Sequence, residues 1–339
     1  LPAQSHPLPP RMFCHSFLVL LGTAIPLLPI NHYDVNTMIS KTNLFRRPRI
    51  LIIGCGDIGI RVAQQLQGNT LTQSQGRPKI FALSRSPGRF TELRKHGITP
   101  IEGNLDHPET LWRIAHLATT VVHLAPPPLD GELDQRTRNL VQILSQQGRS
   151  VRRLVYISTT GVYGNRNGDF VDETSQLQPT SARAKRRVDA EQTLRYWAAS
   201  QGVVLTILRV PGIYGPNRLP IERLQNNTPA LQESFDAYSN HIHADDLARL
   251  TCAALFIGKP QRVINACDGS EQKMGDYFDE VASALHLPKP PRLPPDEVRA
   301  QVGPMMWSFM AESRRVRNQR LGELKRPLKY PVSYTHLRA

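Results

Sequence analysis

A short apolar run followed by three closely spaced glycines constrains the fold of this chain most strongly. Ile50–Ile53 are consecutive apolar residues, mostly β-branched, and they predict a short buried strand. A Gly-x-Gly-x-x-Gly sequence occupies residues 54–59. Apolar residues from Ile58 onward then recur at helical spacing. The order of strand, glycine turn and helix is typical of a site for a dinucleotide pyrophosphate.

Each glycine has a physical task in such a turn. Gly54 permits the tight turn, Gly56 lets the backbone approach the phosphates, and Gly59 lets the helix lie close to the strand. The free N–H groups at the helix start, at Asp57 and Ile58, then face the anion. We therefore predict that residues 54 and 56–59 bind a cofactor. The alternative is an ordinary glycine-rich turn between a strand and a helix.

The composition suits a folded protein with one large domain and a smaller lobe, or with two domains. The chain has 339 residues, of which 40% are hydrophobic and 6% aromatic. Its net charge of +14 raises the question of a nucleic-acid partner. The basic residues are spread along the chain without a zinc-finger, RRM or KH signature, so we expect no nucleic acid. The four cysteines lack metal-like or disulfide-like spacing, which favours the cytoplasm.

Both ends of the chain look foreign to the fold. Residues 1–45 are proline-rich and irregular, and we interpret them as a disordered or non-native leader, with a natural start at Met38. A cleaved signal peptide is the alternative for the apolar run 16–30, which is too short to span a membrane. Residues 332–339 resemble a translated adapter sequence. We expect neither end to contribute to the core.

Predicted strands and helices alternate over the central part of the chain, which indicates a Rossmann-type, doubly wound parallel sheet of the α/β class. We divide the chain into a dinucleotide-binding domain at 46–268 and a small C-terminal substrate lobe at 269–331, to which 216–240 contributes. The predicted strands are 50–53, 79–84, 120–128, 153–158, 203–209 and 263–266, and residues 98–106 are predicted to form a short strand and its exit loop. The predicted helices are 58–66, 90–96, 111–117, 133–147, 182–200 and 274–285. We interpret the proline-rich run 287–295 as a linker.

The end of the second predicted strand bears on the choice of cofactor. An NAD enzyme usually places a carboxylate there for the ribose hydroxyls, whereas this chain has Ser84 followed by Arg85. A guanidinium at this point would pair with a 2′-phosphate, and a neighbouring hydroxyl could add a hydrogen bond. We therefore favour NADP over NAD. The alternative is an ordinary surface arginine.

Several motifs in order resemble the short-chain dehydrogenase/reductase superfamily, in its extended branch of NAD-dependent epimerases and dehydratases. The resemblance covers about 49–331 and joins the glycine motif to the blocks at 123–125, 158–164, 209–216 and 242–248. It implies nicotinamide cofactor contacts from the strand-exit loops as well as from the glycine turn. The residues at these exits are Ser84, Arg85, Asn104, Leu105, Ala125, Pro126 and Pro211. No metal site is expected.

The resemblance also implies an active-site Ser or Thr, Tyr and Lys. In that superfamily the Tyr exchanges a proton with the substrate oxygen while hydride moves to or from the cofactor. Thr159 matches the Ser/Thr position, and Glu191 fixes the register of the following helix. Arg183 then stands at the Tyr position and Arg187 at the Lys position. The chain thus resembles the atypical extended subgroup, which lacks the usual Tyr.

Arginine remains protonated near neutral pH and is a poor acid or base. Arg183 could hold an anion, and Arg187 could hold the nicotinamide ribose. The alternative is that both face solvent on a charged helix. Tyr163 and Tyr214 follow strands and favour structural packing. Asp245, in the run 243–246, suits the first turn of a helix rather than a metal or acid–base site.

Taken together, these patterns predict an NADP-binding oxidoreductase or epimerase for a nucleotide-sugar-like or small carbonyl substrate. Whether it is an active enzyme is open at this point, because a non-catalytic, redox-sensing NADP(H)-binding module would use the same fold. We expect a small-molecule substrate, no membrane partner and no nucleic acid, and we leave a homodimer open.

Overall fold

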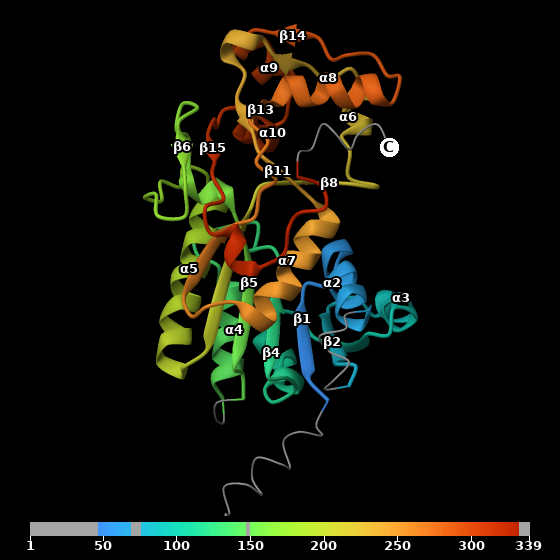
Figure 1. The fold of residues 1–339 in the computed structure, drawn as a ribbon, viewed down its shortest axis with the longest axis vertical. Coiled ribbons are helices and arrows are strands. Elements are labelled where there is room, and N and C mark those ends of the chain that lie inside the picture. Colours follow the sequence, from blue (N-terminus) through green and yellow to red (C-terminus); the bar gives the residue numbers. More distant parts are fainter. Residues whose placement is uncertain (1–46, 69–75, 147–149, 332–339) are drawn as a thin grey trace, which may run out of the picture. The chain divides into compact units, whose positions relative to one another are not determined.

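A parallel sheet of seven strands forms the centre of the protein, for which a computed structural model describes residues 47–68, 76–146 and 150–331. The strand order is β12-β7-β5-β4-β1-β2-β3, and every neighbouring pair is parallel (Figure 1). The predicted doubly wound sheet is confirmed. The interpretations of 1–45 and 332–339 lie outside the described residues. The strands are β1 (Arg49–Ile53), β2 (Lys79–Ser84), β3 (Thr99–Glu102), β4 (Thr120–His123), β5 (Arg153–Thr159), β7 (Val204–Val210) and β12 (Arg262–Asn265).

Strand β1 shows why its sequence is apolar throughout. Ile50 and Ile52 join one hydrophobic cluster, while Leu51 and Ile53 join another on the opposite face. Side chains alternate between the faces of a strand, so a central strand covered on both sides needs apolar residues at every position. All four residues are almost fully buried.

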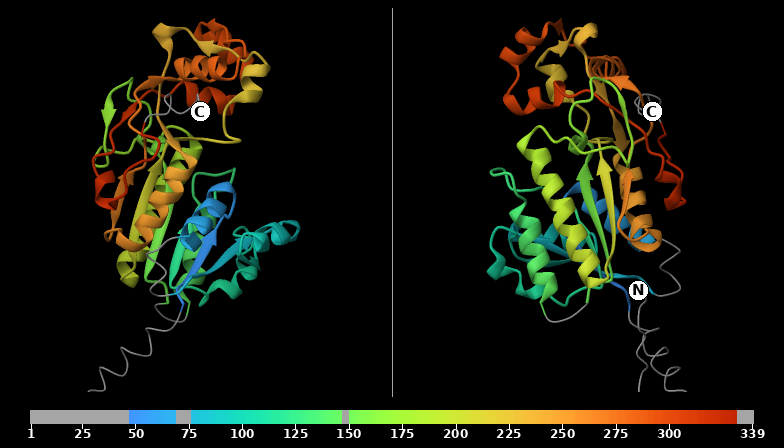
Figure 2. Two further views of the ribbon diagram at one scale, coloured as in Figure 1. Left: turned by 45° about the vertical axis from the view of Figure 1, so that its right-hand side comes forward. Right: turned by 90° about the vertical axis from the view of Figure 1, so that its left-hand side faces the viewer.

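Helices cover both faces of the sheet. Helices α2 (Asp57–Gly68) and α7 (Ala244–Ile257) contact each other and share the cluster of Ile50, and α4 (Gln135–Ser145) and α5 (Ala182–Gln201) likewise share the cluster of Leu51 (Figure 2). Helix α3 (Phe90–Lys95) follows β2. Val62 and Leu66 on α2 are fully buried, as their helical spacing predicts.

Because all seven strands are parallel, the segments that follow them leave the sheet at the same edge. Because β1 lies between β2 and β4, the chain winds away from β1 in both directions. The carboxyl ends at such a switch point form a crevice, which is the usual ligand position in open α/β sheets. The residues that follow β1, β2, β3, β4, β5 and β7 surround a common space.

A buried ion pair fixes α5 to the sheet. The carboxylate of Glu191 on α5 receives hydrogen bonds from Arg209 on β7 at 3.0 and 2.7 Å, and both side chains are almost fully buried. Ser158 on β5 donates to the same carboxylate at 2.6 Å. Arg209 also donates to the Tyr163 hydroxyl at 3.0 Å, and that hydroxyl donates to Asn265 on β12 at 2.7 Å. One polar network thus joins α5 to three strands.

A second group of elements comes mainly from the C-terminal part of the chain. Two small hydrophobic clusters hold it together, one around Tyr277 and Phe278 and the other around Val298 and Met310. The proposed lobe boundaries at 216–240 and 269–331 stay predictions. The helices are α6 (Ile221–Gln225), α8 (Met274–Ala284), α9 (Pro295–Gln301) and α10 (Pro304–Met310). Short strand pairs accompany them: β6 (Phe170–Val171) with β15 (Arg315–Val316), β8 (Gly212–Tyr214) with β11 (His241–His243), β9 (Ala230–Leu231) with β14 (Arg292–Leu293), and β10 (Tyr238–Ser239) with β13 (Gln272–Lys273).

Two segments differ from their predicted structure. The helix expected at 111–117 is wrong, because the structure has a short 3₁₀ turn at Trp112–Ile114. Leu111 and Ile114 are buried and Trp112 is exposed, so apolar residues spaced by three satisfy a single tight turn. The proline-rich run 287–295, expected to be a linker, contains β14, which pairs with β9.

The sequence indicates neither disulfide bonds nor a segment that spans a membrane. Cys55, Cys252 and Cys267 are free and buried, while Cys14 lies outside the described residues. Over the ranges that the structure describes, none of the helices combines the length and apolar character needed to span a bilayer.

The Glu191–Arg209 pair yields a stability prediction. Replacing Glu191 by Gln should lower the free energy of unfolding by about 3–5 kcal/mol, because it leaves the Arg209 charge buried without its partner. The double variant Glu191→Gln with Arg209→Met should recover part of that loss. Urea denaturation followed by circular dichroism measures both, with exposed Glu109→Gln as the control. A loss of less than about 1 kcal/mol in the single variant would contradict this account.

Candidate functional site

The glycine turn after β1 has the geometry expected from its sequence. Gly54 has φ of +81°, and a Cβ atom there would lie 2.5 Å from the backbone nitrogen of Ala125. Any other residue would therefore be both strained and obstructed. At Gly56 a Cβ atom would meet nothing within 4 Å. The backbone at Gly56 is open toward the space beside it, and the first N–H groups of α2 follow directly.

A cavity of about 680 Å³ opens at this turn and runs along the carboxyl edge of the sheet. Every residue predicted to bind cofactor or to act in catalysis lines it. The cofactor set is Gly54, Gly56, Asp57, Ile58, Gly59, Ser84, Arg85, Asn104, Leu105, Ala125, Pro126 and Pro211, and the catalytic set is Thr159, Arg183 and Arg187. The structure brings these residues together, and their individual roles stay predictions.

Three further arginines line the cavity that the sequence analysis missed. Arg89, Arg136 and Arg218 each form an ion pair with a carboxylate, on Glu92, Asp106 and Asp57 respectively. Their signal in the sequence was weak, because they come from a 3₁₀ turn, a helix start and a loop that only the fold assembles.

Asp57 illustrates how charge is balanced at the turn. Burial alone would raise the pKa of its carboxyl group, but hydrogen bonds from Arg218 and Arg61 outweigh burial and lower that pKa. Arg218 donates at 2.7 Å and Arg61 at 2.9 Å. The carboxylate is therefore neutralised by cations on two sides. It would therefore repel an anion at the predicted binding turn less than an unpaired carboxylate would.

Arg85 differs from these three arginines. It is exposed at the end of β2, and among the residues with described positions it has no ion pair or hydrogen bond. Ser84 lies beside it, half-buried, and its hydroxyl accepts from the Ser86 N–H at 3.4 Å. Its charge acts at longer range on the Asp106 carboxylate, but with no hydrogen bond or ion pair to a described residue Arg85 is available to an incoming anion.

Thr159 lies at the end of β5, and its hydroxyl oxygen already accepts one hydrogen bond from the backbone. The Thr159 oxygen accepts a hydrogen bond from the Gly161 N–H at 3.1 Å, which caps the 3₁₀ turn Thr160–Tyr163. A hydroxyl that accepts from the backbone still carries its own proton. Thr159 can therefore donate to an oxygen placed in the cavity.

Arg187 is engaged by the backbone and by a tyrosine. Its Nη1 donates to the Tyr156 hydroxyl at 2.9 Å, to the Ile157 carbonyl at 3.0 Å and to the Ala125 carbonyl at 3.5 Å. These contacts tie α5 to the exits of β4 and β5. The alternative of a solvent-facing Arg187 is therefore wrong.

Arg183 lies one turn before Arg187 on α5 and is half-buried. Its guanidinium carbon is 3.9 Å from the centre of the Phe309 ring, on α10. Burial and then the charge of Arg187 lower the pKa of Arg183. Arg183 thus lies between α10 and the cavity, and the solvent-facing alternative does not describe it either.

The tyrosines near the strand exits are structural, as the sequence analysis favoured. Tyr163 is fully buried and its hydroxyl belongs to the Glu191 network. Tyr214 is almost fully buried. Tyr156 is also buried, and burial raises its pKa to about 12. None of the three is among the residues that line the described cavity.

The run 243–246 also has a structural role. His243 caps α7 by accepting from the Asp245 N–H at 3.1 Å, and Asp245 lies in the first turn. The Asp246 carboxylate accepts from Arg249 and from the backbone N–H groups of Lys329 and Tyr330. Among the residues the structure places, no three side chains of His, Cys, Asp or Glu form a metal-binding group.

Comparison with known proteins assigns this architecture to a family. The family model of the NAD dependent epimerase/dehydratase family matches residues 50–267. The chain belongs to this family. The matched stretch contains the glycine turn and all the strand-exit residues that line the cavity.

The curated relatives match part of the chain and part of their own length. The human dTDP-D-glucose 4,6-dehydratase is 31% identical over 144 residues, which make up 40% of this chain and 41% of the human protein. The UDP-glucose 4-epimerase of Azospirillum brasilense is 26% identical over 233 residues, or 65% of this chain and 61% of that protein. The chain therefore spans less than two thirds of each of these relatives.

Solved structures match over most of the chain. A functionally unknown conserved protein from Silicibacter pomeroyi is 30% identical with a TM-score of 0.70, and the match covers 86% of this chain and 97% of that one. The dTDP-glucose 4,6-dehydratase of Bacillus anthracis, in complex with NAD, is 17% identical with a TM-score of 0.67 over 86% of this chain and 94% of that one. The UDP-glucuronic acid 4-epimerase of Bacillus cereus, also with NAD, is 18% identical with a TM-score of 0.66, covering 86% and 96%. The last two likenesses show the fold.

The two glycines of the turn offer a matched pair of tests. Gly56→Ala should leave the melting temperature nearly unchanged, because its Cβ meets no atom within 4 Å, yet weaken dinucleotide binding at least tenfold by filling the space beside the backbone. Gly54→Ala should lower the melting temperature by several degrees, because its Cβ would overlap Ala125. Differential scanning fluorimetry and NADPH titration separate the two effects. Full cofactor affinity in Gly56→Ala would contradict the assignment of this turn.

Proposed function

We propose that the protein is an NADP(H)-binding oxidoreductase or epimerase that acts on a nucleotide-sugar-like or small carbonyl substrate. The observation that carries this proposal is a shared cavity, which is lined by the glycine turn at one part of the sheet edge and by Thr159, Arg183 and Arg187 at another. A relative named UDP-glucose 4-epimerase and another named dTDP-D-glucose 4,6-dehydratase support the substrate class. The cytoplasmic location and the homodimer remain predictions.

The turn fits a dinucleotide. Gly54 supplies the left-handed backbone and close approach to Ala125, and Gly56 leaves open space where a side chain would otherwise stand. Residues 57–59 start α2, and the N–H groups of a helix's first turn are available to a phosphate. A bound nicotinamide cofactor would donate or accept hydride in this cavity.

The position of Arg85 at the rim of the cavity favours NADP over NAD, because its guanidinium could bind the 2′-phosphate of NADP. Arg89, Arg136 and Arg218 already hold carboxylates, whereas Arg85 has no partner among the described residues. A phosphate there would gain a charge-assisted contact without breaking an existing ion pair. No carboxylate follows β2 that would suit the ribose hydroxyls of NAD instead.

This preference can be measured directly. NADPH should bind more tightly than NADH, and Arg85→Asp should weaken NADPH by about 1.5–3 kcal/mol while changing NADH little. Calorimetric titration of both cofactors gives the values. Arg113→Asp, at another exposed arginine outside the cavity lining, is the charge-matched control. Equal affinities for the two cofactors in the unmodified protein would contradict the proposal.

The residues lining the cavity can orient an oxygen and stabilise negative charge. The Thr159 hydroxyl retains a proton to donate, and the guanidinium of Arg183 is cationic near neutral pH. Fewer of the lining residues can exchange a proton with the substrate. No histidine, lysine or tyrosine is among the described lining residues, and burial raises the pKa of the Cys55 thiol to about 11. In this proposal the proton comes from water or from a group on the substrate.

Turnover should therefore be slow. General acid–base assistance is worth about 10²–10⁴-fold, so carbonyl reduction should be weak, and Arg183→Tyr with Arg187→Lys should raise it. A steady-state assay against nucleotide sugars and simple ketones, following NADPH absorbance, measures this. The melting temperature must be checked in parallel, because a lysine at position 187 would lose part of the contacts that Arg187 makes with Tyr156 and Ile157. Robust turnover by the unmodified protein, abolished by Thr159→Ala, would contradict the proposal that the site lacks acid–base assistance.

A second candidate is a non-catalytic, redox-sensing NADP(H)-binding module. The same observation favours it, namely that no histidine, lysine or tyrosine is among the described lining residues. The two candidates differ in one result. The sensor binds NADPH and NADP⁺ with different affinities and shows no turnover with any substrate in the panel, whereas the enzyme shows turnover that depends on Thr159.

A further inference from the structure

Arg183 is a cation held in place without an anionic partner of its own. It is half-buried, lines the cavity, and lies with its guanidinium carbon 3.9 Å from the centre of the Phe309 ring. Within the part of the chain that the structure describes, it has neither a hydrogen bond nor an ion pair. A guanidinium has five N–H donors, and a ring face satisfies none of them with a hydrogen bond.

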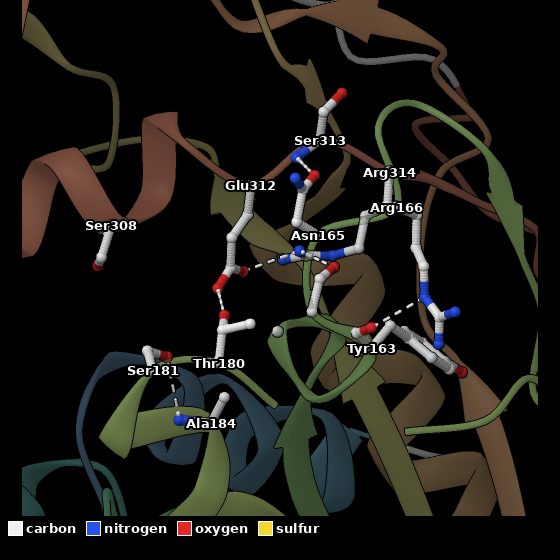
Figure 3. A network of polar contacts seen from close by, with 12 residues as sticks. Tyr163, Asn165, Arg166, Thr180, Ser181, Ala184, Ser308, Glu312, Ser313 and Arg314 are labelled. Carbon is white, nitrogen blue, oxygen red and sulfur yellow. Dashed lines mark hydrogen bonds and ion pairs between the residues drawn. The ribbon is translucent and has the colours of Figure 1, made fainter. Parts of the chain in front are cut away.

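The charges around Arg183 are mostly of the same sign. Burial and then the charges of Arg187, Arg314 and Arg186 lower the pKa of Arg183, whereas the charge of Glu312 acts in the opposite sense. Glu312 is already engaged on both oxygens. Its Oε1 accepts from Thr180 at 2.7 Å and its Oε2 from Arg314 at 2.8 Å (Figure 3).

The segment that holds Glu312 and Arg314 is fixed over the start of α5. Asn165 accepts from the Ser313 N–H at 2.9 Å, and the Ser313 carbonyl accepts from the Arg166 N–H at 2.8 Å (Figure 3). Arg314 Nη1 also donates to the Gly164 carbonyl at 2.8 Å. These bonds hold α10, which carries Phe309 and precedes this segment, beside the start of α5. Phe309 therefore lies against the Arg183 guanidinium, and Arg183 also lines the cavity.

The position of Arg183 along the sheet separates it from the cofactor phosphates. The glycine turn follows β1 and Arg85 follows β2, whereas Arg183 belongs to the connection that follows β5. In the strand order, β4 lies between β5 and β1, and β2 lies beyond β1. At about 4.8 Å per strand, β5 is about 10 Å from β1 and about 14 Å from β2. The exit of β5, which leads to the α5 helix that carries Arg183, thus lies at another part of the sheet edge from the glycine turn.

We propose that Arg183 binds an anionic group of the substrate, a carboxylate or a phosphate, at the β5 end of the cavity. This deepens the proposed function and rests on it. The planar fork of a guanidinium matches two oxygens of such a group, and the contact with the Phe309 ring restricts where the guanidinium can move. The arginine at the position of the usual tyrosine is then a substrate-binding residue, and the substrate class is acidic.

The test titrates sodium malonate and, separately, inorganic phosphate into the full chain by calorimetry, without NADPH and with NADPH at saturation. The unmodified protein should bind at least one of these anions under both conditions, because the cofactor occupies a different part of the cavity. Arg183→Gln should weaken that binding at least tenfold, and Arg183→Lys, which keeps the charge without the fork, should weaken it less. Arg113→Gln should change nothing. Stronger binding of malonate or of phosphate identifies the anion.

Several results would overturn the inference. These are equal anion affinity in Arg183→Gln and the unmodified protein, binding only in the absence of NADPH, and no binding up to about 50 mM. Failure of NADPH to bind the unmodified protein would instead contradict the proposed function, while Arg183-dependent anion binding could still be seen. If Arg183→Gln does not fold, malonate or phosphate should slow phenylglyoxal modification of Arg183 in the unmodified protein, as followed by peptide mass spectrometry. Unchanged modification would overturn the inference.

Discussion

The buried ion pair between Glu191 and Arg209 is the contact on which the site depends. Two charges are removed from water at the centre of the molecule, which is costly unless every oxygen and N–H group finds a partner. Ser158 and Tyr163 complete the set of partners, and Asn265 extends it to the edge strand β12. The result is a helix that cannot shift along the sheet without leaving a charge unpaired.

The fixed position of α5 also fixes two residues of the cavity. Arg187 lies one turn before Glu191 on this helix, and Arg183 lies one turn before Arg187. Glu191 faces β5 and β7, so the two arginines on the same side of the helix face the strand exits. The contact of Arg187 with the Ile157 carbonyl sets the same register from the other end. Placing cations at this end of the cavity is thus a consequence of how the helix is fixed, as well as of which residues it carries.

Most of the central sheet could be predicted from the sequence because its inner strands are apolar on both faces. The bounds of β2 match the prediction at both ends, since Lys79 and Ser84 border four buried residues. The helix expected at 111–117 failed because Leu111 and Ile114 satisfy a 3₁₀ turn as well as a helix. Two-residue strands such as β14 carry no periodic signal that a sequence could reveal.

The candidate site was predictable where it follows the strands and unpredictable where it depends on distant segments. Thr159 and Arg187 could be placed from a motif and a helical register. The partner of Arg218 could not be predicted, since Asp57 meets Arg218 only after the chain has crossed the sheet. Phe309 likewise reaches Arg183 only through α10, whose position is set by the contacts of Glu312 and Ser313.

The unequal pairing of the arginines around the cavity has a kinetic consequence. Arg89, Arg136 and Arg218 are each neutralised at short range, so their fields largely cancel beyond a few ångströms, while Arg85 at the rim and Arg183 further along the sheet edge keep theirs. A field that is focused by the low-dielectric walls of a cleft speeds the arrival of oppositely charged molecules more than it slows their departure. The association rate of an anionic ligand should fall steeply as ionic strength rises, with much less effect on its dissociation rate. The protein would then select its ligands partly during diffusion, before any contact forms.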